Sequence, residues 1–197
     1  MKSIAAVVLL AGIVLFSSCG QDKNLKLAEQ MVKDGNLKKA IELYTNVVTD
    51  QQDTKAADNA RLALAGIYYK QKNYENAIKN LSGMSDKRKE AQDVTDILAK
   101  CQAERLLLEG IKSAAVEFRQ HYVKEREVKH QEINYSSPVF SGTADSLFTA
   151  SGVKMPKIMP DISNYKVDVT LTDDPLEPTK ININFPDGFK KELVLNY

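Results

Sequence analysis

The sequence predicts an α+β protein in which helical hairpins precede a small antiparallel sheet. Two observations lead to this prediction. A helical pattern repeats every 37 positions in the first half of the chain, and apolar and polar residues alternate near the C-terminus. The composition, with 43% hydrophobic and 27% charged residues among 197, excludes a disordered or multi-span chain. The chain therefore has enough apolar residues for one or two hydrophobic cores.

The N-terminus has the features of a secretory signal. Lys2 precedes an apolar run over residues 4–16, which has the length of a signal-peptide core and is too short to cross a bilayer about 30 Å thick. We therefore expect residues 1–18 to be a signal peptide.

The residues after this run resemble the lipobox of bacterial lipoproteins. Ser17 and Ser18 are small residues before a cysteine, although Phe16 stands where Leu usually opens the box. The resemblance implies that Cys19 becomes the lipidated N-terminus and anchors the protein to a membrane. By resemblance to known sorting signals, Gly20 in place of Asp favours the outer membrane of the bacterial cell envelope. The alternative is an ordinary signal peptide with an incidental cysteine.

The charge balance and the cysteine content argue against a nucleic-acid partner and against a disulfide within the chain. Without residues 1–18, which contain one basic residue, 26 basic residues balance 26 acidic ones. This balance argues against nucleic acid as a partner. Once Cys19 is lipidated, Cys101 is the remaining thiol, so no disulfide within the chain is expected. Cys101 falls at an apolar helical position, and we expect it to be a small buried residue.

The repeat aligns equivalent residues in successive units. Asn36 and Asn73 are 37 positions apart, and Ala40, Ala77 and Ala114 follow one another at the same interval. In the first two units a second alanine lies 12 positions before Ala40 or Ala77. This distance predicts two antiparallel helices that meet closely, with a turn at residues 35–36 or 72–73.

The strings around these alanines resemble the tetratricopeptide repeat (TPR). They are Leu27-Ala28-x-x-Met31 with Ala40-x-x-x-Tyr44, and Leu64-Ala65-x-x-Tyr68 with Asn73-Tyr74-Glu75-Asn76-Ala77-Ile78. The usual TPR period is 34, and the extra residues are placed in the polar connections between units. The resemblance gives two clear units and one degenerate unit. The alternative is a helical bundle with chance internal similarity.

The third unit leaves two arrangements open. Ala114 and Phe118 match the repeat, but the expected turn at residues 106–110 is largely apolar. Two short helices and one long helix from about Glu90 to His130 are both compatible with the sequence.

After His130 the pattern becomes that of a sheet. Residues 165–171 and 181–185 alternate apolar and polar side chains, and Pro186-Asp187-Gly188 predicts a turn into a third strand over 189–197. A short strand at 138–140 is a further possibility, and the sheet is expected to pack against the last helices. The expected organisation is a tether at 19–24, a helical domain at 25–130, an extended connection at 131–162 and a β-rich segment at 163–197.

No enzyme motif is present, so we expect no catalytic activity and no cofactor. His121 and Glu125 lie four residues apart and are expected to form an exposed ion pair rather than a metal site. Asp173 and Asp174 are expected to lie in a polar turn rather than to hold a cation.

The TPR resemblance implies a function as a protein-protein interaction adaptor. In TPR proteins the first helix of each unit lines a groove that holds a partner peptide or helix. The corresponding residues here are Leu62, Gly66, Tyr69, Lys70, Ala99, Ala103 and Leu106. The same residues could instead pack on the protein's own C-terminal segment. The alternative function is that of a lipoprotein that binds a nutrient or glycan with its β segment.

Overall fold

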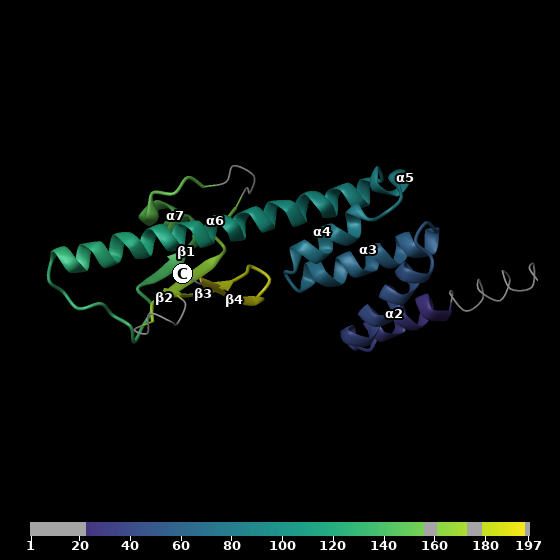
Figure 1. Cartoon of the computed structure of the whole chain (residues 1–197), viewed down its shortest axis with the longest axis horizontal. Helices are drawn as coiled ribbons and strands as arrows, with labels where there is room; N and C mark the ends of the chain where they lie inside the picture. The colour runs from purple at the N-terminus through teal and green to yellow at the C-terminus, as the bar shows by residue number, and fades with distance from the viewer. Residues whose placement is uncertain (1–22, 156–160, 173–178, 196–197) are drawn as a thin grey trace, which may run out of the picture. The chain divides into compact units, whose positions relative to one another are not determined.

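The computed structural model describes residues 23–155, 161–172 and 179–195 (Figure 1). By their contacts the residues divide into two compact units, with the boundary after Gln102. The predicted α+β class is confirmed, since packed helices precede a four-stranded antiparallel sheet. The predicted signal peptide and Cys19 lie outside the described residues.

The first unit is made of helices joined by short turns. They are a helix whose described part covers residues 23–33, α2 (Leu37–Asp50), α3 (Lys55–Lys70), α4 (Tyr74–Ser82), α5 (Asp86–Lys89) and the first part of α6 (Gln92–Val128). Helix α3 packs against both α2 and α4. The unit thus has the hairpin order that the repeat predicts.

The two hairpin turns, 37 residues apart, have the same geometry. A residue with positive φ, Gly35 (75°) or Lys72 (55°), precedes the asparagine that begins the next helix. The N–H groups of Asn36 and Asn73 donate to the carbonyl five residues earlier, at 2.8 and 2.9 Å. Their side chains accept from the N–H three residues later, at 3.2 and 3.3 Å. Each asparagine therefore closes one helix and caps the next.

The repeat alanines lie at the helix contacts. Ala28, Ala40, Ala65 and Ala77 are each fully buried, at 0% exposure. Small side chains at these points let the backbones of neighbouring helices approach closely. The predicted repeat register is therefore consistent with the helix packing in the first two repeats.

The third, degenerate repeat forms one continuous helix rather than a hairpin. Helix α6 runs for 37 residues through the position of the expected turn. Leu107, Leu108 and Ile111 are buried there, whereas a turn would expose its backbone to water. The helix ends at Val128, and His130 (φ 51°) follows in the left-handed conformation.

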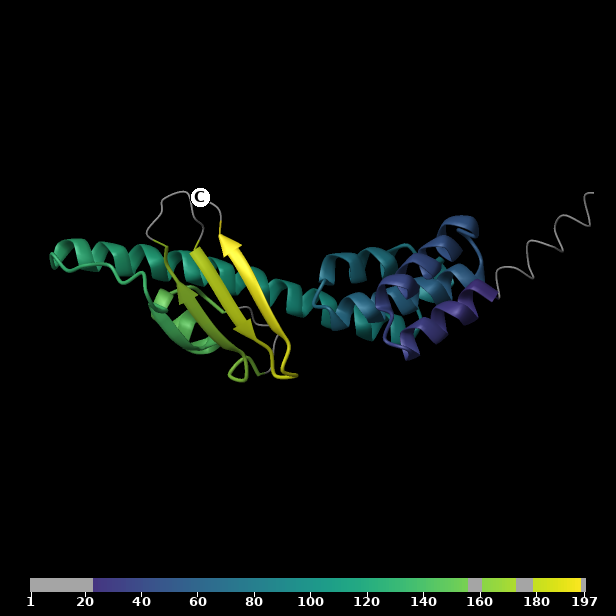
Figure 2. The same ribbon diagram turned by 90° about the horizontal axis from the view of Figure 1, so that it is seen from below.

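The second unit contains the rest of α6 and a sheet. Its elements are β1 (Phe140–Thr143), α7 (Ala144–Ser151), β2 (Lys166–Thr170), β3 (Thr179–Asn184) and β4 (Lys190–Leu195). The strands are antiparallel and lie side by side in chain order (Figure 2).

The connection expected at 131–162 contains a short strand, which the sequence offered as a possibility at 138–140, and a helix, which was not predicted. Strand β1 begins at Phe140, later than the expected short strand, and α7 follows it directly. Helix α7 buries Leu147 and Phe148 and ends at Ser151, and Gly152, whose φ is 72°, caps its C-terminus. An eight-residue helix gives a weak periodic signal in a sequence, so tertiary packing decides that it forms.

The sheet has one buried face and one polar face. Val167, Val169, Ile181 and Ile183 point to the buried face and are at most 1% exposed. The second half of α6 lies along this face (Figures 1 and 2). The rings of Phe118 on α6 and Phe140 on β1 meet edge to face at 5.3 Å. The expected packing of the sheet against a helix is therefore confirmed.

Candidate functional site

One side of α3 carries four of the predicted groove residues. Leu62, Gly66 and Tyr69 are half-buried and Lys70 is exposed. A Cβ placed on Gly66 would meet no atom within 4 Å beyond the helix itself. We call these four residues the α3 face. It is open to solvent at Gly66, and its residues are spaced to lie on one side of the helix.

The remaining groove residues do not all belong to this unit. Ala99 on α6 is exposed and lies in the first unit, whereas Ala103 and Leu106 are half-buried and belong to the second. Leu107, which follows them, is buried. The predicted seven-residue set is thus divided between two compact units, because α6 continues through the expected turn.

The adjacent Tyr68 and Tyr69 have different surroundings. Tyr68 packs against the core cluster formed with α2. The ring of Tyr69 lies 5.9 Å from that of the buried Tyr74, and the Lys72 ammonium lies 5.6 Å from the Tyr69 ring centroid. Tyr69 therefore stabilises the hairpin turn as well as contributing to the α3 face. This second role was not predicted, because it depends on the left-handed backbone at Lys72.

A polar cluster that was not predicted from the sequence joins α3 to the start of α5. Asp58 is buried and accepts hydrogen bonds from the backbone and hydroxyl of Ser85. Arg61 lies 3.6 Å from the same carboxylate and donates to the carbonyl of Gln52 at 2.8 Å. The available signal was a carboxylate at a buried helical position, which requires partners.

A hollow of about 470 Å³ adjoins this cluster. It is lined by Asp53, Thr54, Lys55, Asp58, Asn59, Ser85, Lys87 and Arg88. The two terminal guanidinium nitrogens of Arg88, Nη1 and Nη2, donate to the Asp93 carboxylate at 2.8 and 2.6 Å, and these hydrogen bonds hold the pKa of Asp93 below its ordinary value. Three polar side chains of the lining, Asp58, Ser85 and Arg88, therefore already have hydrogen-bond partners, which is typical of structural clusters.

The candidate metal ligands have other roles. Glu125 bonds to Lys129, and that bond lowers the pKa of the Glu125 carboxyl. The expected ion pair of His121 with Glu125 is therefore wrong, because the Glu125 carboxylate pairs with Lys129, four residues further along the chain. In the part of the chain that the structure describes, no group of three potential ligands is arranged to hold a metal ion. Asp173 and Asp174 lie outside the described residues.

Cys101 is fully buried, as expected for a small apolar residue. No helix among residues 23–155, 161–172 and 179–195 is long and apolar enough to cross a membrane.

The helical hairpins with their shared turn geometry correspond to a known family. The model of the tetratricopeptide repeat-like domain matches residues 16–100. This region is a TPR-like domain. The match ends near the start of α6, where the hairpin pattern also ends. No curated protein and no solved structure matches the chain significantly. TPR-like domains bind other proteins, so the TPR-like domain implies a protein partner in general terms.

Proposed function

We propose that this protein is a lipid-anchored, non-catalytic adaptor of the bacterial cell envelope that binds a partner protein through its TPR-like domain. The observation that carries the proposal is the TPR-like match over residues 16–100 together with the open α3 face. The partner contacts Leu62, Gly66, Tyr69 and Lys70.

The chemistry of the α3 face supports a protein partner. Leu62 and Tyr69 offer apolar area, and tyrosine is enriched among residues that dominate binding energies. Gly66 leaves space between them into which a partner side chain can insert. Lys70 adds a charge at the rim, where charges affect specificity and association rate more than affinity.

The N-terminal sequence supports a membrane anchor. Lipid on Cys19 holds the chain at the outer membrane, since several acyl chains together give stable attachment. The first described helix includes residue 23, so a fully extended tether of residues 19–22 spans at most about 14 Å. The TPR-like domain, and any partner on it, therefore lies next to the membrane surface.

Site-specific photo-crosslinking tests the adaptor function. A photoreactive amino acid replaces Leu62 or Lys70 on the α3 face, and the matched control replaces Lys79, an exposed residue of α4. We expect one discrete protein adduct from the two test positions and none from Lys79. Equal adducts at all three positions, or none at the test positions, would contradict the proposal.

Lipid labelling tests the anchor separately. Wild type is expected to incorporate labelled fatty acid and to sediment with membranes. The Cys19→Ala variant is expected to lose the label and either to keep its signal peptide or to be released in soluble form. Unchanged labelling of Cys19→Ala would show that the lipid is not attached at this residue.

A further inference from the structure

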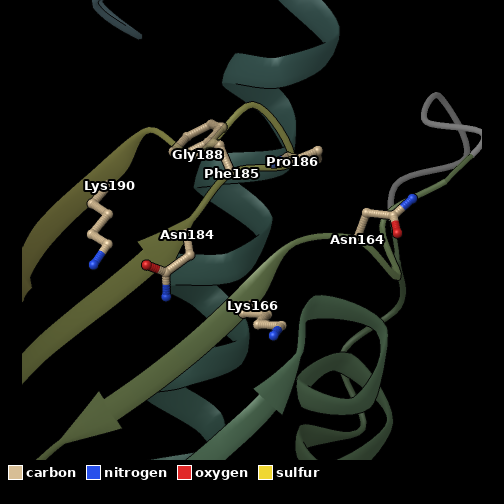
Figure 3. Close-up of a pocket in the computed structure, with 7 residues that line it drawn as sticks. All are labelled: Asn164, Lys166, Asn184, Phe185, Pro186, Gly188 and Lys190. Atoms are coloured by element: carbon tan, nitrogen blue, oxygen red, sulfur yellow. The ribbon is translucent and has the colours of Figure 1, made fainter.

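The exposed face of the C-terminal sheet carries a pocket of about 680 Å³ (Figure 3). It is lined by Asn164, Lys166, Asn184, Phe185, Pro186, Gly188 and Lys190. All of these residues belong to the second unit. Its volume is within the usual range for small-molecule sites, about 300–1,000 Å³. We call it the sheet pocket.

Strand register places two lysines on opposite sides of one asparagine. Lys166 on β2 pairs with Asn184 on β3, which pairs in turn with Lys190 on β4. The three side chains project from adjacent strands on the same face (Figure 3). Two strand spacings separate the lysine Cα atoms by about 10 Å. Asn184 thus separates like charges and adds an amide between them.

The two lysines have no ion-pair partner among the residues that the structure describes. Asp168 and Glu192 both pair with Asn182, two residues along the strands on the same face of the sheet. Neither carboxylate forms an ion pair with Lys166 or Lys190. Asp168 instead accepts a hydrogen bond from Ser141 on β1. The lining residues include two ammonium groups and no carboxylate, so the pocket has a local positive charge on a chain that is close to neutral.

The wall of the pocket is a turn fixed by its own hydrogen bonds. The N–H of Phe185 donates to the carbonyl of Phe189 at 2.8 Å, and Asp187 accepts from the N–H of Phe189 at 3.1 Å. The buried ring of Phe185 meets the rings of Tyr165 and Phe189 edge to face, at 5.4 and 5.9 Å. Gly188 has a φ of 83°, a conformation that glycine adopts without strain. The lysines therefore flank a preorganised turn.

We propose that the sheet pocket binds the oxyanion group of an organic ligand, a phosphate or a carboxylate. Two ammonium groups attract the anion and donate charge-assisted hydrogen bonds to its oxygens. Asn184 supplies a further amide donor between the lysines, and Pro186 gives an apolar surface beside the anion. The inference is independent of the adaptor function, since it concerns residues outside the TPR-like domain.

Nuclear magnetic resonance of the isotope-labelled full chain in a zwitterionic detergent tests this proposal. In the first experiment sodium phosphate is added, and sodium chloride of equal ionic strength serves as the control. In the second experiment bicelles of phosphatidylcholine with or without phosphatidylglycerol are added. The test variant is Lys166→Gln with Lys190→Gln. The control is Lys180→Gln, an exposed β3 lysine on the same face that does not line the pocket.

We expect shifts in the amide signals of residues 164–166 and 184–190 that the double variant abolishes and Lys180→Gln retains. A response to phosphate indicates a soluble ligand, and a response to phosphatidylglycerol alone indicates a lipid headgroup. Either response supports the proposal. It is overturned by the absence of shifts in both experiments, by shifts that persist in the double variant, or by an equal response at all exposed lysines.

Discussion

The carboxylate of Asp58 on α3 accepts two hydrogen bonds from Ser85, one from the backbone N–H at 3.0 Å and one from the hydroxyl at 2.6 Å. The residues are 27 positions apart, and Ser85 precedes α5 directly. These two hydrogen bonds fix the segment that leads from α4 to α6 onto the first turn of α3.

Removing the Asp58 carboxylate should destabilise the helical unit. Asp58→Ala is expected to lower the free energy of unfolding by about 1–3 kcal/mol, since it removes the part-buried hydrogen bonds with Ser85 and the ion pair with Arg61. Asp58→Asn keeps one acceptor oxygen and should cost less. Urea denaturation followed by circular dichroism measures both, and a double-mutant cycle with Ser85→Ala isolates the pair. Additive effects in that cycle would show that the two residues are not coupled.

The buried repeat alanines leave no room for larger side chains. Ala77 is 0% exposed, so Ala77→Leu is expected to overpack the contact of α4 with α3 and to cost about 1–3 kcal/mol. Ala99→Leu is the matched control, since Ala99 is an exposed helical alanine in the same unit. The control should change the unfolding midpoint little. A midpoint for Ala77→Leu equal to that of wild type would contradict the repeat register.

Two glycines of the helical unit should respond to alanine with opposite signs. Gly35 has a φ of 75°, and Gly35→Ala should cost about 1–2 kcal/mol because a Cβ is strained in this conformation. Gly66 lies within α3 with open space around it, so Gly66→Ala should stabilise by about 0.5–1 kcal/mol. Thermal unfolding of both variants measures the difference. The same sign for both would show that the turn or the helix is misassigned.

Tyr165 should make the second unit sensitive to alkali. Burial, aided by the negative charges of Glu104 and Asp187, raises the pKa of its phenol from 10.0 to about 12. The folded state thus favours the neutral phenol, so this stabilisation is complete below pH 10 and is lost as pH rises through about 12.

The comparison of wild type with Tyr165→Phe tests this dependence, because phenylalanine cannot ionise. Wild type should lose more stability than Tyr165→Phe between pH 10 and about 12, as measured by urea midpoints. Parallel midpoints over this interval would show that Tyr165 titrates equally in the folded and unfolded chains.

Local sequence predicted the features that depend on short spacings. The 37-residue offset identified the two hairpin turns, and the alternation of residues 165–171 and 181–185 identified two strands and their buried face. Both signals arise because a helix or strand presents its apolar residues at a fixed period. The TPR-like match over residues 16–100 agrees with this part of the prediction.

Tertiary structure alone decided the features that depend on long-range contacts. Helix α6 continues through residues 106–110 because its apolar side chains are buried there, and α7 forms because Leu147 and Phe148 have a core to enter. Asp58 and Ser85, which form hydrogen bonds, are 27 positions apart in the sequence. Lys166 and Lys190, which both pair with Asn184 in the sheet, are 24 positions apart. No short-range pattern records such pairs, because their energy exists only once packing or strand register has brought the two segments together.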